Sequence, residues 1–352
     1  MPLSGSQKDT ILEAARFAPS ADNSVPWQYS WKDNDVLCLY NDKTRSGAAT
    51  DSTYILTNLA MGAATENIML CAHTLGLSAA TSYKKEGDEI CVTISFEVFT
   101  TETRVESEVQ LAEQIENRHS DRRFPYKGEI TSEIIKQLTE SINNTSHSLI
   151  IYNDKTSIKQ IVPIIRRAEA VRFKSESLHA ELFDTVKFDD NNPLEGMTLD
   201  VLGIEAPARP MFKLLKKWSA MKRLNLIGVS QLIAVRSVTL PIVNSPGLAM
   251  ITTPSDSAID IFNAGRQIQR VWLKATNLGL SVHLYAAPGV LTLAKPNLNQ
   301  ALSEELVEIE TRLDKITSGT DKAVMFLRLG YKEGTPPRAG RREVKELEKQ
   351  LS

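Results

Sequence analysis

The chain has 352 residues, of which 42% are hydrophobic and 24% charged, and its formal net charge is −2. This is the composition of a globular protein with enough apolar residues for a core, and it excludes a chain that is disordered throughout. The near-neutral charge disfavours a dedicated nucleic-acid or membrane-surface binder, because neither a basic face nor a basic tail dominates.

The first part of the chain predicts a helix, a hairpin, a long helix and two strands. Apolar spacing and turn residues place them, in chain order, at a helix over 9–18, a loop over 20–27, a hairpin over 28–40 around Lys32–Asp35, a helix over 54–75, and strands over 79–84 and 90–98.

The second part begins with a helix over 131–143, for which Thr131-Ser132-Glu133-Ile134 is interpreted as a capping box. The elements that follow are a strand over 148–153, a mostly helical stretch over 155–240, a strand over 248–252, a helix over 257–278, a strand over 323–329, and a charged helical tail over 341–351. The stretch 155–240 has no counterpart in the first part. A segment that long between core elements predicts a lid rather than a loop.

Two stretches repeat each other at a constant offset of 203: Gly62–Ser78 and Gly265–Ser281. Both are interpreted as buried helices that end at a glycine, Gly76 or Gly279, because glycine adopts the left-handed conformation without strain. Any two buried helices that end in Leu-Gly-Leu would show some of this likeness, so the repeat alone leaves that alternative open.

The flanks of the repeat differ in an informative way. A Pro-Ser-Asn loop precedes the first helix, and a cationic run precedes the second, and neither half has the feature of the other. This favours a symmetric dimer that was fused and kept one of its two sites. The predicted half-repeats are residues 1–110 and 111–352, and the insertion at 155–240 belongs to the second.

Three motifs are candidates for ligand contacts. The run Arg118-x-Ser120-x-Arg122-Arg123 offers forked donors suited to phosphate. The segment 336–342 brings further cations after a glycine, and the loop 19–27 has two prolines that fix its backbone and small residues that leave amides accessible. A solvated basic patch, a frayed terminus and an ordinary helix-to-strand connection are the respective structural alternatives.

The cysteines, the N-terminal residues and the most apolar stretch indicate the compartment of the protein. Three cysteines are far apart and form no C-x-x-C pair, which predicts no disulfide framework and no metal site: Cys38, Cys71 and Cys91. The N-terminal residues lack a cationic stretch followed by an apolar one, and the apolar stretch 224–251 is broken by prolines and an arginine. We therefore expect a cytoplasmic protein without nucleic-acid or membrane partners.

Together these motifs resemble the FMN-dependent nitroreductase family. The matching segments are Pro19-Ser20-Ala21-x-Asn23-Ser24-x-Pro26-Trp27, Arg118-His119-Ser120-x-Arg122-x-Phe124, Asn244-Ser245-Pro246-Gly247 and Ala339-Gly340-Arg341. Usual members are short chains that dimerise with flavin at the interface. The split of the motifs over a tandem pair is similar to the monomeric, duplicated members, including the mycobacterial Acg-type group. The resemblance implies an α+β nitroreductase-like fold, an intramolecular pseudo-dimer, and one FMN for each chain.

The resemblance also implies roles for individual residues. Arg118, Ser120 and Arg341 would hold the phosphate, and Arg122 would lie along the ribityl chain towards the pyrimidine edge. The remaining contacts to the ring system would come from Pro19, Ser20, Asn23, Asn244, Ala287 and Gly289. His283 is a weak candidate for a proton donor, and His119 is expected to point away from the flavin, because neighbouring side chains of an extended segment face opposite sides.

The function that the resemblance implies is hydride transfer through flavin N5, between NAD(P)H or an organic donor and a nitro compound, a quinone or an activated alkene. Two alternatives stay open. The insertion could close over the flavin and leave a storage or sequestering protein, or the chain could be a biosynthetic tailoring dehydrogenase or oxidase with an open cleft under 155–240. No Gly-x-Gly-x-x-Gly follows a strand, so a separate nicotinamide domain is not expected.

Overall fold

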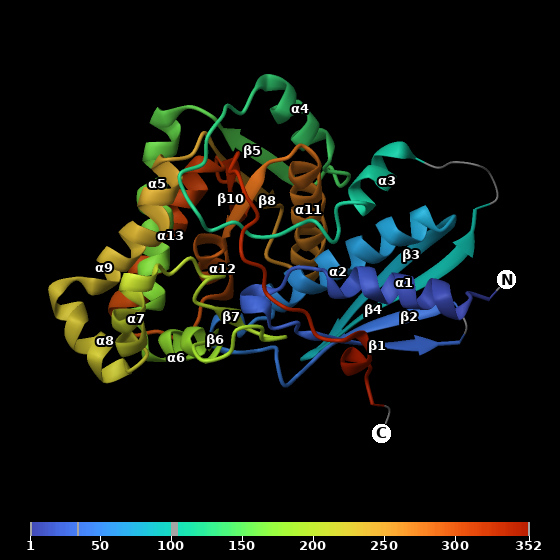
Figure 1. Cartoon of the computed structure of the whole chain (residues 1–352), viewed down its shortest axis with the longest axis horizontal. Helices are drawn as coiled ribbons and strands as arrows, with labels where there is room; N and C mark the ends of the chain where they lie inside the picture. Colours follow the sequence, from blue (N-terminus) through green and yellow to red (C-terminus); the bar gives the residue numbers. More distant parts are fainter. Residues whose placement is uncertain (1, 34, 100–104, 351–352) are drawn as a thin grey trace.

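Two four-stranded antiparallel sheets, each beside one long helix, form the frame of the molecule (Figure 1). The structure is a computed structural model that describes residues 2–33, 35–99 and 105–350. The first sheet has the order β1-β2-β4-β3 and packs on helix α2 (Ile55–Thr74). Its strands are β1 (Trp27–Lys32), β2 (Val36–Asn41), β3 (Leu77–Glu86) and β4 (Glu89–Val98).

The second sheet has the order β5-β8-β10-β9 and packs on helix α11 (Ala258–Asn277). Its strands are β5 (Ser148–Tyr152), β8 (Gly247–Thr253), β9 (Ser281–Tyr285) and β10 (Lys322–Gly330). Two strands, the long helix and two more strands follow one another in both halves, and corresponding strands take corresponding places in the two sheets. The predicted α+β class is confirmed.

The two long helices cross where the repeat aligned two glycines. A Cβ on Gly62 would lie 2.1 Å from the Phe262 carbonyl oxygen, and one on Gly265 would lie 2.2 Å from the Leu59 carbonyl oxygen. The backbones of α2 and α11 therefore touch directly, which only residues without a side chain permit. Both helices end as predicted, at Gly76 and Gly279, with φ of +74° and +72°. Although α2 is long and apolar enough to span a membrane, 89% of its apolar window is buried inside the protein.

Three helical expectations differ from the structure. Helix α1 (Gly5–Arg16) begins earlier than predicted, because Ser4 and Gln7 form a reciprocal capping box. Helix α4 (Ser132–Glu140) has only half of the predicted box: Thr131 accepts from the Ile134 amide, but isoleucine has no acceptor to return the bond. The helical tail over 341–351 is also wrong: the chain forms one short turn, Val344–Leu347, and then bonds to the edge of β1, where the Lys349 amide donates to the Tyr29 carbonyl at 2.7 Å.

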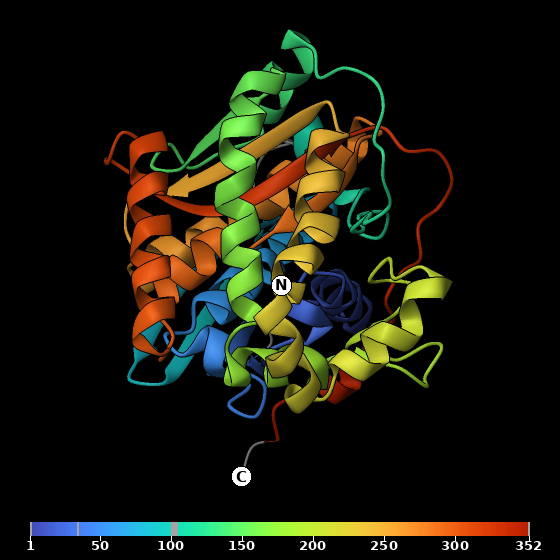
Figure 2. The same cartoon turned by 90° about the vertical axis from the view of Figure 1, so that its left-hand side faces the viewer.

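The predicted insertion is mostly helical and has its own apolar cluster, centred on Phe183 and Met221. Its elements are α5 (Lys155–Arg172), α6 (Glu176–Asp184), the paired strands β6 (Val186–Lys187) and β7 (Met197–Thr198), α7 (Arg209–Leu215), α8 (Trp218–Leu224), α9 (Val229–Ala234) and α10 (Leu240–Val243). Figure 2 shows these helices stacked along one side of the molecule. Three further helices complete the frame: α3 (Glu106–Ala112), α12 (Ala287–Ala294) and α13 (Gln300–Ile316).

Buried ion pairs join the long helices and make stability depend on pH. Arg270 of α11 donates to Glu66 of α2 at 2.7 Å and to Glu108 of α3 at 2.5–2.9 Å. Burial acts to raise the pKa of the Glu108 carboxyl, but hydrogen bonds and attraction from Arg270 outweigh it and hold the pKa below its ordinary value of 4.5. The stabilising contribution is therefore complete above 4.5 and is lost as the pH falls through the lower, folded pKa.

We expect the urea midpoint to fall as the pH is lowered from about 5 to about 3, and to fall less steeply in Glu108→Gln. Urea titrations at several pH values measure the difference. Glu106→Gln, a change at an exposed position of the same helix, is the control and should follow the wild type. Parallel curves for Glu108→Gln and wild type would contradict this assignment.

Candidate functional site

A cavity of about 120 Å3 lies where four parts of the chain meet: the first half, the second half, the insertion, and residues 336–342, here called the C-terminal segment. The first-half loop contributes Pro19, Ser20, Asp22 and Asn23, and the cationic run contributes Arg118, His119, Ser120 and Arg122. The other lining residues are Phe17, Glu116, Met197, Val201, Trp272, Pro337, Arg338, Ala339 and Arg341. The structure thus brings together seven predicted site residues that are up to 322 positions apart in the sequence: Pro19, Ser20, Asn23, Arg118, Ser120, Arg122 and Arg341.

Arg118 is a buried cation that forms no ion pair with any carboxylate in the described part of the chain. Its Nη2 donates to the Phe17 carbonyl at 2.9 Å, its guanidinium lies over the Trp272 ring at 4.2 Å, and its Nε has no partner among the described residues. Burial, with repulsion from Arg341 and Arg338, lowers the pKa of Arg118 well below its usual range. A side chain in this state gains most from a bound anion, which would restore the charge balance and satisfy the free donor.

Arg341 approaches the same cavity from the C-terminal segment. Its Nη1 donates to the Asn23 side-chain oxygen, and its Nε has no partner among the described residues. Burial, with repulsion from Arg16 and Arg338, lowers the pKa of Arg341 to about 10. The cavity therefore holds a second cation that no described carboxylate neutralises.

Two acidic residues line the cavity, Asp22 and the exposed Glu116. Asp22 pairs with Arg172 of α5 at 3.5 Å. The backbone carbonyl of Glu116 accepts from Arg338 at 3.1 Å. A larger open groove of about 620 Å3 lies between α1, α2 and α3, and it shares Glu116 with the cavity. That groove carries Asp9, Glu13 and Glu113 besides Glu116, so it repels phosphate, and the smaller arginine-lined cavity is the better anion site.

The first-half loop is held in a strained conformation. Asp22, Asn23 and Val25 have positive φ values of 50°, 58° and 47°, a region that β-branched valine strongly disfavours. Hydrogen bonds stabilise this conformation of the loop: the Asn23 side-chain amide donates to the carbonyls of Leu194 and Gly340 at 3.2 and 3.1 Å. The loop thereby ties the insertion and the C-terminal segment to the first half.

Neighbouring arginines of the cationic run have different roles. Arg122 donates to the Val201 carbonyl at 3.2 Å and to the Met197 sulfur at 3.4 Å, and burial lowers its pKa. Arg123 points away from the cavity and pairs with Asp121 at 2.7 Å. The role that the resemblance implied for Arg122, and not for Arg123, agrees with this difference in direction.

Three of the predicted cofactor contacts do not line this cavity: Asn244, Ala287 and Gly289. Asn244 is exposed and ends α10, where its side-chain amide donates to the Leu240 carbonyl at 2.8 Å. Ala287 and Gly289 lie in the first turn of α12, and a Cβ on Gly289 would meet the Val324 carbonyl oxygen at 2.2 Å. These two residues therefore pack the helix on β10.

The two histidines also differ from expectation. His283 stands on β9 opposite Arg328, outside the cavity lining, and burial, with repulsion from Arg328 and Arg122, lowers its pKa well below the usual range. His119 does line the cavity, against the expectation from strand alternation, because residues 117–119 are not in a strand. Its Nδ1 lies 2.7 Å from the Asn117 carbonyl oxygen.

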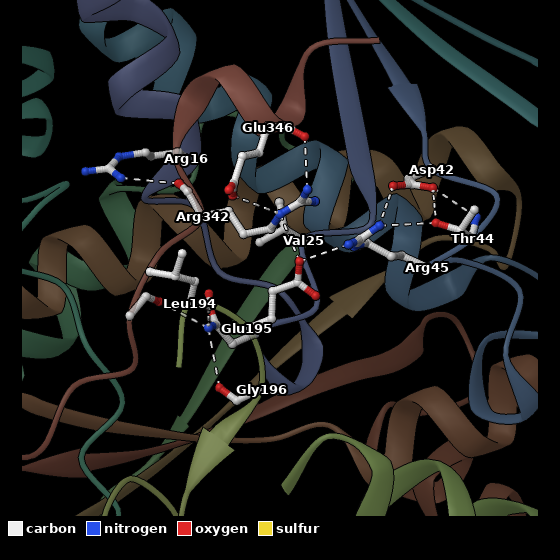
Figure 3. Close-up of polar contacts among 12 residues, drawn as sticks. Arg16, Val25, Asp42, Thr44, Arg45, Leu194, Glu195, Gly196, Arg342 and Glu346 are labelled. Atoms are coloured by element: carbon white, nitrogen blue, oxygen red, sulfur yellow. Dashed lines mark hydrogen bonds and ion pairs between the residues drawn. The ribbon is translucent and has the colours of Figure 1, made fainter. Parts of the chain in front are cut away.

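A segment of the insertion, residues 186–204, crosses the cavity and is here called the strap. Figure 3 shows Glu195 of the strap between two arginines, Arg45 of the first half at 2.9 Å and Arg342 of the C-terminal segment at 2.8 Å. Met197 and Val201 of the strap form part of the cavity wall. The strap is thus held by an arginine of the first half and by one of the C-terminal segment, and two of its residues form part of the wall of the cavity that Arg118 and Arg341 line.

Sequence reasoning missed the strap residues and Trp272. Met197 and Val201 lie in a stretch without a recognisable motif, and Trp272 resembles any buried aromatic residue of a core helix. Its place in the repeat was the one available signal, because at the offset of 203 Trp272 corresponds to the smaller Met69 of the first helix. Within the described residues, no group of three or more His, Cys, Asp or Glu side chains is arranged to hold a metal ion.

No protein-family model matches the chain, and no curated protein matches it. Among solved structures, it is similar to a nitroreductase with bound FMN from Desulfitobacterium hafniense DCB-2, with 14% identity and a TM-score of 0.37, over 69% of this chain and 98% of that chain. It is also similar to a BluB-like flavoprotein from Clostridium difficile 630, with 14% identity and a TM-score of 0.38, over 69% and 99% of the two chains.

A third similar structure is the FMN-dependent nitroreductase NfnB from Mycobacterium smegmatis in complex with NADPH, with 16% identity and a TM-score of 0.36, over 69% of this chain and 98% of that chain. Such identities and TM-scores do not establish membership of a family. The ligand of the cavity therefore has to be argued from the residues that line it.

Proposed function

We propose that the chain is an FMN-dependent oxidoreductase of the nitroreductase type, with one flavin site built between two fused halves. The observation that carries the proposal is a pair of arginines, the buried Arg118 and the partly buried Arg341, which face one cavity without a carboxylate partner among the described residues. A phosphate supplies the charge and the acceptor oxygens that these donors lack. Ser120 lines the same cavity and offers a hydroxyl donor.

The fused-dimer part of the proposal is supported by the symmetry of the frame. Both halves have the same order of strands, and the two glycines aligned by the repeat meet at one helix crossing. Residues 1–110 and 111–352 would then be the two half-repeats, acting as a monomer. Each half contributes one side of the site, the Pro19–Asn23 loop from the first and the cationic run from the second.

The cavity is too small for a whole flavin, so the strap would have to move for FMN to bind. About 120 Å3 accommodates a phosphate group, but it is below the roughly 300 Å3 at which pockets for larger ligands begin. Space for the rings would come from movement of Met197 and Val201, which would also free the Arg122 guanidinium for the ribityl chain or the pyrimidine edge. Pro19, Ser20 and Asn23 would border the rings. Asn244, Ala287, Gly289 and His283 have no assigned contact in this arrangement.

When bound, FMN supplies a site, N5, that takes up a hydride and passes it on. The chain's own residues would fix the cofactor by its phosphate and exclude water with the strap. Arg122 would stabilise negative charge at the pyrimidine edge. Donors would be NAD(P)H or an organic hydride donor, and acceptors nitro compounds, quinones or activated alkenes.

A second function, flavin sequestration without turnover, is favoured by one observation, the fastening of the strap by Glu195. A strap that stays closed would keep a second substrate from the flavin. A tailoring enzyme with an open cleft under the insertion receives less support, because the cavity beneath the strap is small.

Titration of the purified full chain with FMN and with riboflavin tests the site. We expect FMN to bind about 10- to 100-fold more tightly, because riboflavin lacks the phosphate that the arginines would hold. Equal affinities would contradict the assignment. Anaerobic addition of NADPH or NADH to the FMN-loaded protein then separates the functions: rapid loss of flavin absorbance indicates a reductase, and reduction by dithionite alone indicates sequestration or another donor.

A further inference from the structure

The insertion ends in a corner that protrudes from the molecule. The helical residues Trp218–Ile227 meet Val229–Val243 at an angle of 88°, and Gly228, with φ of +82°, lies at the bend. In Figure 1, α8 and α9 form the left-hand extremity, far from the strands of the first sheet. The residues at the bend, Leu226 and Ile227, are 87% and 75% exposed.

The apolar exposure is concentrated around this corner. Half of the large apolar side chains that are exposed in the described part of the chain lie between residues 211 and 240: Met211, Leu214, Leu226, Ile227, Leu232 and Leu240. The insertion does not need them for its core, which Phe183, Leu215 and Met221 form on the inner side. A concentration of exposed apolar side chains marks a surface that binds something.

The corner is held in place rather than frayed. The Asn225 side-chain amide donates to the Phe173 carbonyl of α5 at 2.7 Å, and the Asn225 side-chain oxygen accepts from the Ser230 amide at 3.2 Å. One side chain thus fixes both arms of the bend to the body of the insertion. Leu226 and Ile227 are therefore exposed by a built structure.

The same region is strongly basic although the whole chain is nearly neutral. Residues 206–255 contain no Asp or Glu, and they contain seven cations: Arg209, Lys213, Lys216, Lys217, Lys222, Arg223 and Arg236. Three of these cations form ion pairs with acids from residues 189–205: Arg209 with Asp200, Lys213 with Asp189, and Arg236 with Glu205. Lys217, Lys222 and Arg223 are exposed, and none of them forms an ion pair with a described carboxylate.

We propose that this corner, residues 218–232, docks on the surface of an anionic lipid membrane. Leu226 and Ile227 would enter the boundary between headgroups and acyl chains, and Lys222 and Arg223 would lie at the level of the headgroups. A fluid lipid surface closes around a protruding apolar tip, whereas a folded protein would have to offer a matching pocket. Lys217, Lys222 and Arg223, which are exposed and form no ion pair with a described carboxylate, match the negative charge of such a surface. The proposal is independent of the ligand of the arginine-lined cavity.

Flotation of the full chain with lipid vesicles tests the proposal. We expect binding to vesicles of phosphatidylcholine with phosphatidylglycerol, weaker binding as salt is raised, and little binding to phosphatidylcholine alone. Lys222→Glu with Arg223→Glu should lower the partition coefficient by about tenfold or more, because each surface cation contributes about fivefold. Leu226→Ser with Ile227→Ser should lower it by a similar factor and leave the salt dependence intact.

A matched control lies on another helix. Val307→Ser with Lys315→Glu changes an exposed apolar and an exposed basic residue of α13, and should leave binding unchanged. Circular dichroism of each variant establishes that it folds. Equal partition of the corner variants and the wild type, or no binding to anionic vesicles at low salt, would overturn the proposal. A dimer that Leu226→Ser with Ile227→Ser dissociates, without vesicle binding, would overturn it in favour of a contact between copies.

Discussion

Replacing Arg118 with methionine is expected to weaken FMN binding by about 10- to 100-fold and to stabilise the ligand-free protein. The first effect follows from the loss of charge-assisted hydrogen bonds to the phosphate, each worth about 1.5–3 kcal/mol. The second follows because the ligand-free protein buries this guanidinium without a carboxylate partner among the described residues. A side chain of similar length without charge removes that cost, so we expect about 1 kcal/mol of added stability, or roughly 2–4 °C in Tm.

The neighbouring arginine provides the matched control. Arg123 pairs with Asp121 and donates to the Glu333 carbonyl at 3.1 Å, outside the cavity. Arg123→Met should therefore leave FMN affinity unchanged and lower Tm, the reverse of the pattern at Arg118. Fluorescence titration with FMN and thermal unfolding without it measure both quantities. If Arg118→Met destabilises the ligand-free protein and binds FMN normally, Arg118 is a structural residue and not a phosphate ligand.

Adding one methyl group at the helix crossing is expected to cost the protein about 3 kcal/mol or more. In Gly62→Ala the new Cβ would stand 2.1 Å from the Phe262 carbonyl oxygen, so α2 and α11 must separate. The higher helix propensity of alanine, worth up to about 1 kcal/mol, does not offset a backbone clash. Gly265→Ala should have the same effect, because its Cβ would stand 2.2 Å from the Leu59 carbonyl oxygen.

Urea unfolding of the two variants measures this cost. Gly5→Ala is the control, because that glycine lies in the first turn of α1 with no atom within 4 Å of the added Cβ. It should unfold at the wild-type urea concentration or slightly above it. A wild-type midpoint for Gly62→Ala would show that the long helices do not touch as closely as the structure has them.

Much of the frame could be predicted because local signals and packing agree. Gly76 and Gly279 end their helices as expected, and the hairpin turns between Lys32 and Val36. The tail over 341–351 could not be predicted in this way. Its charged sequence has helical character, but an edge strand 320 residues earlier offers backbone partners to Lys349, and a sequence does not show which edges remain open.

The candidate site was predictable where motifs carry donors. The two segments that motif reasoning paired, around Ser20 and around Arg118, do line one cavity. One failure concerns side-chain direction: His119 was expected to point away from the site, but it lines the cavity. Gly289 was interpreted as a ligand-contact glycine, whereas the structure gives it a close approach to the Val324 carbonyl. Both kinds of glycine look the same in a sequence.

The expectation that the protein has no membrane-surface partner used the net charge of the whole chain. A net charge of −2 is compatible with a stretch of fifty residues, 206–255, that has no acidic side chain. The acids that balance it lie elsewhere, for example along α13. The charge that a partner meets is the charge of one surface, and the fold is needed to know which residues share that surface.

Arg341 and Arg342 are consecutive, yet they serve different structures: the first lines the arginine-lined cavity, and the second holds Glu195 of the strap. A displacement of this short peptide would move both side chains. If an anion in the cavity displaced Arg341, the strap would be affected through Arg342, and this linkage would be reciprocal. An anion that favoured release of the strap would bind the released form more tightly than the fastened form, by the same factor.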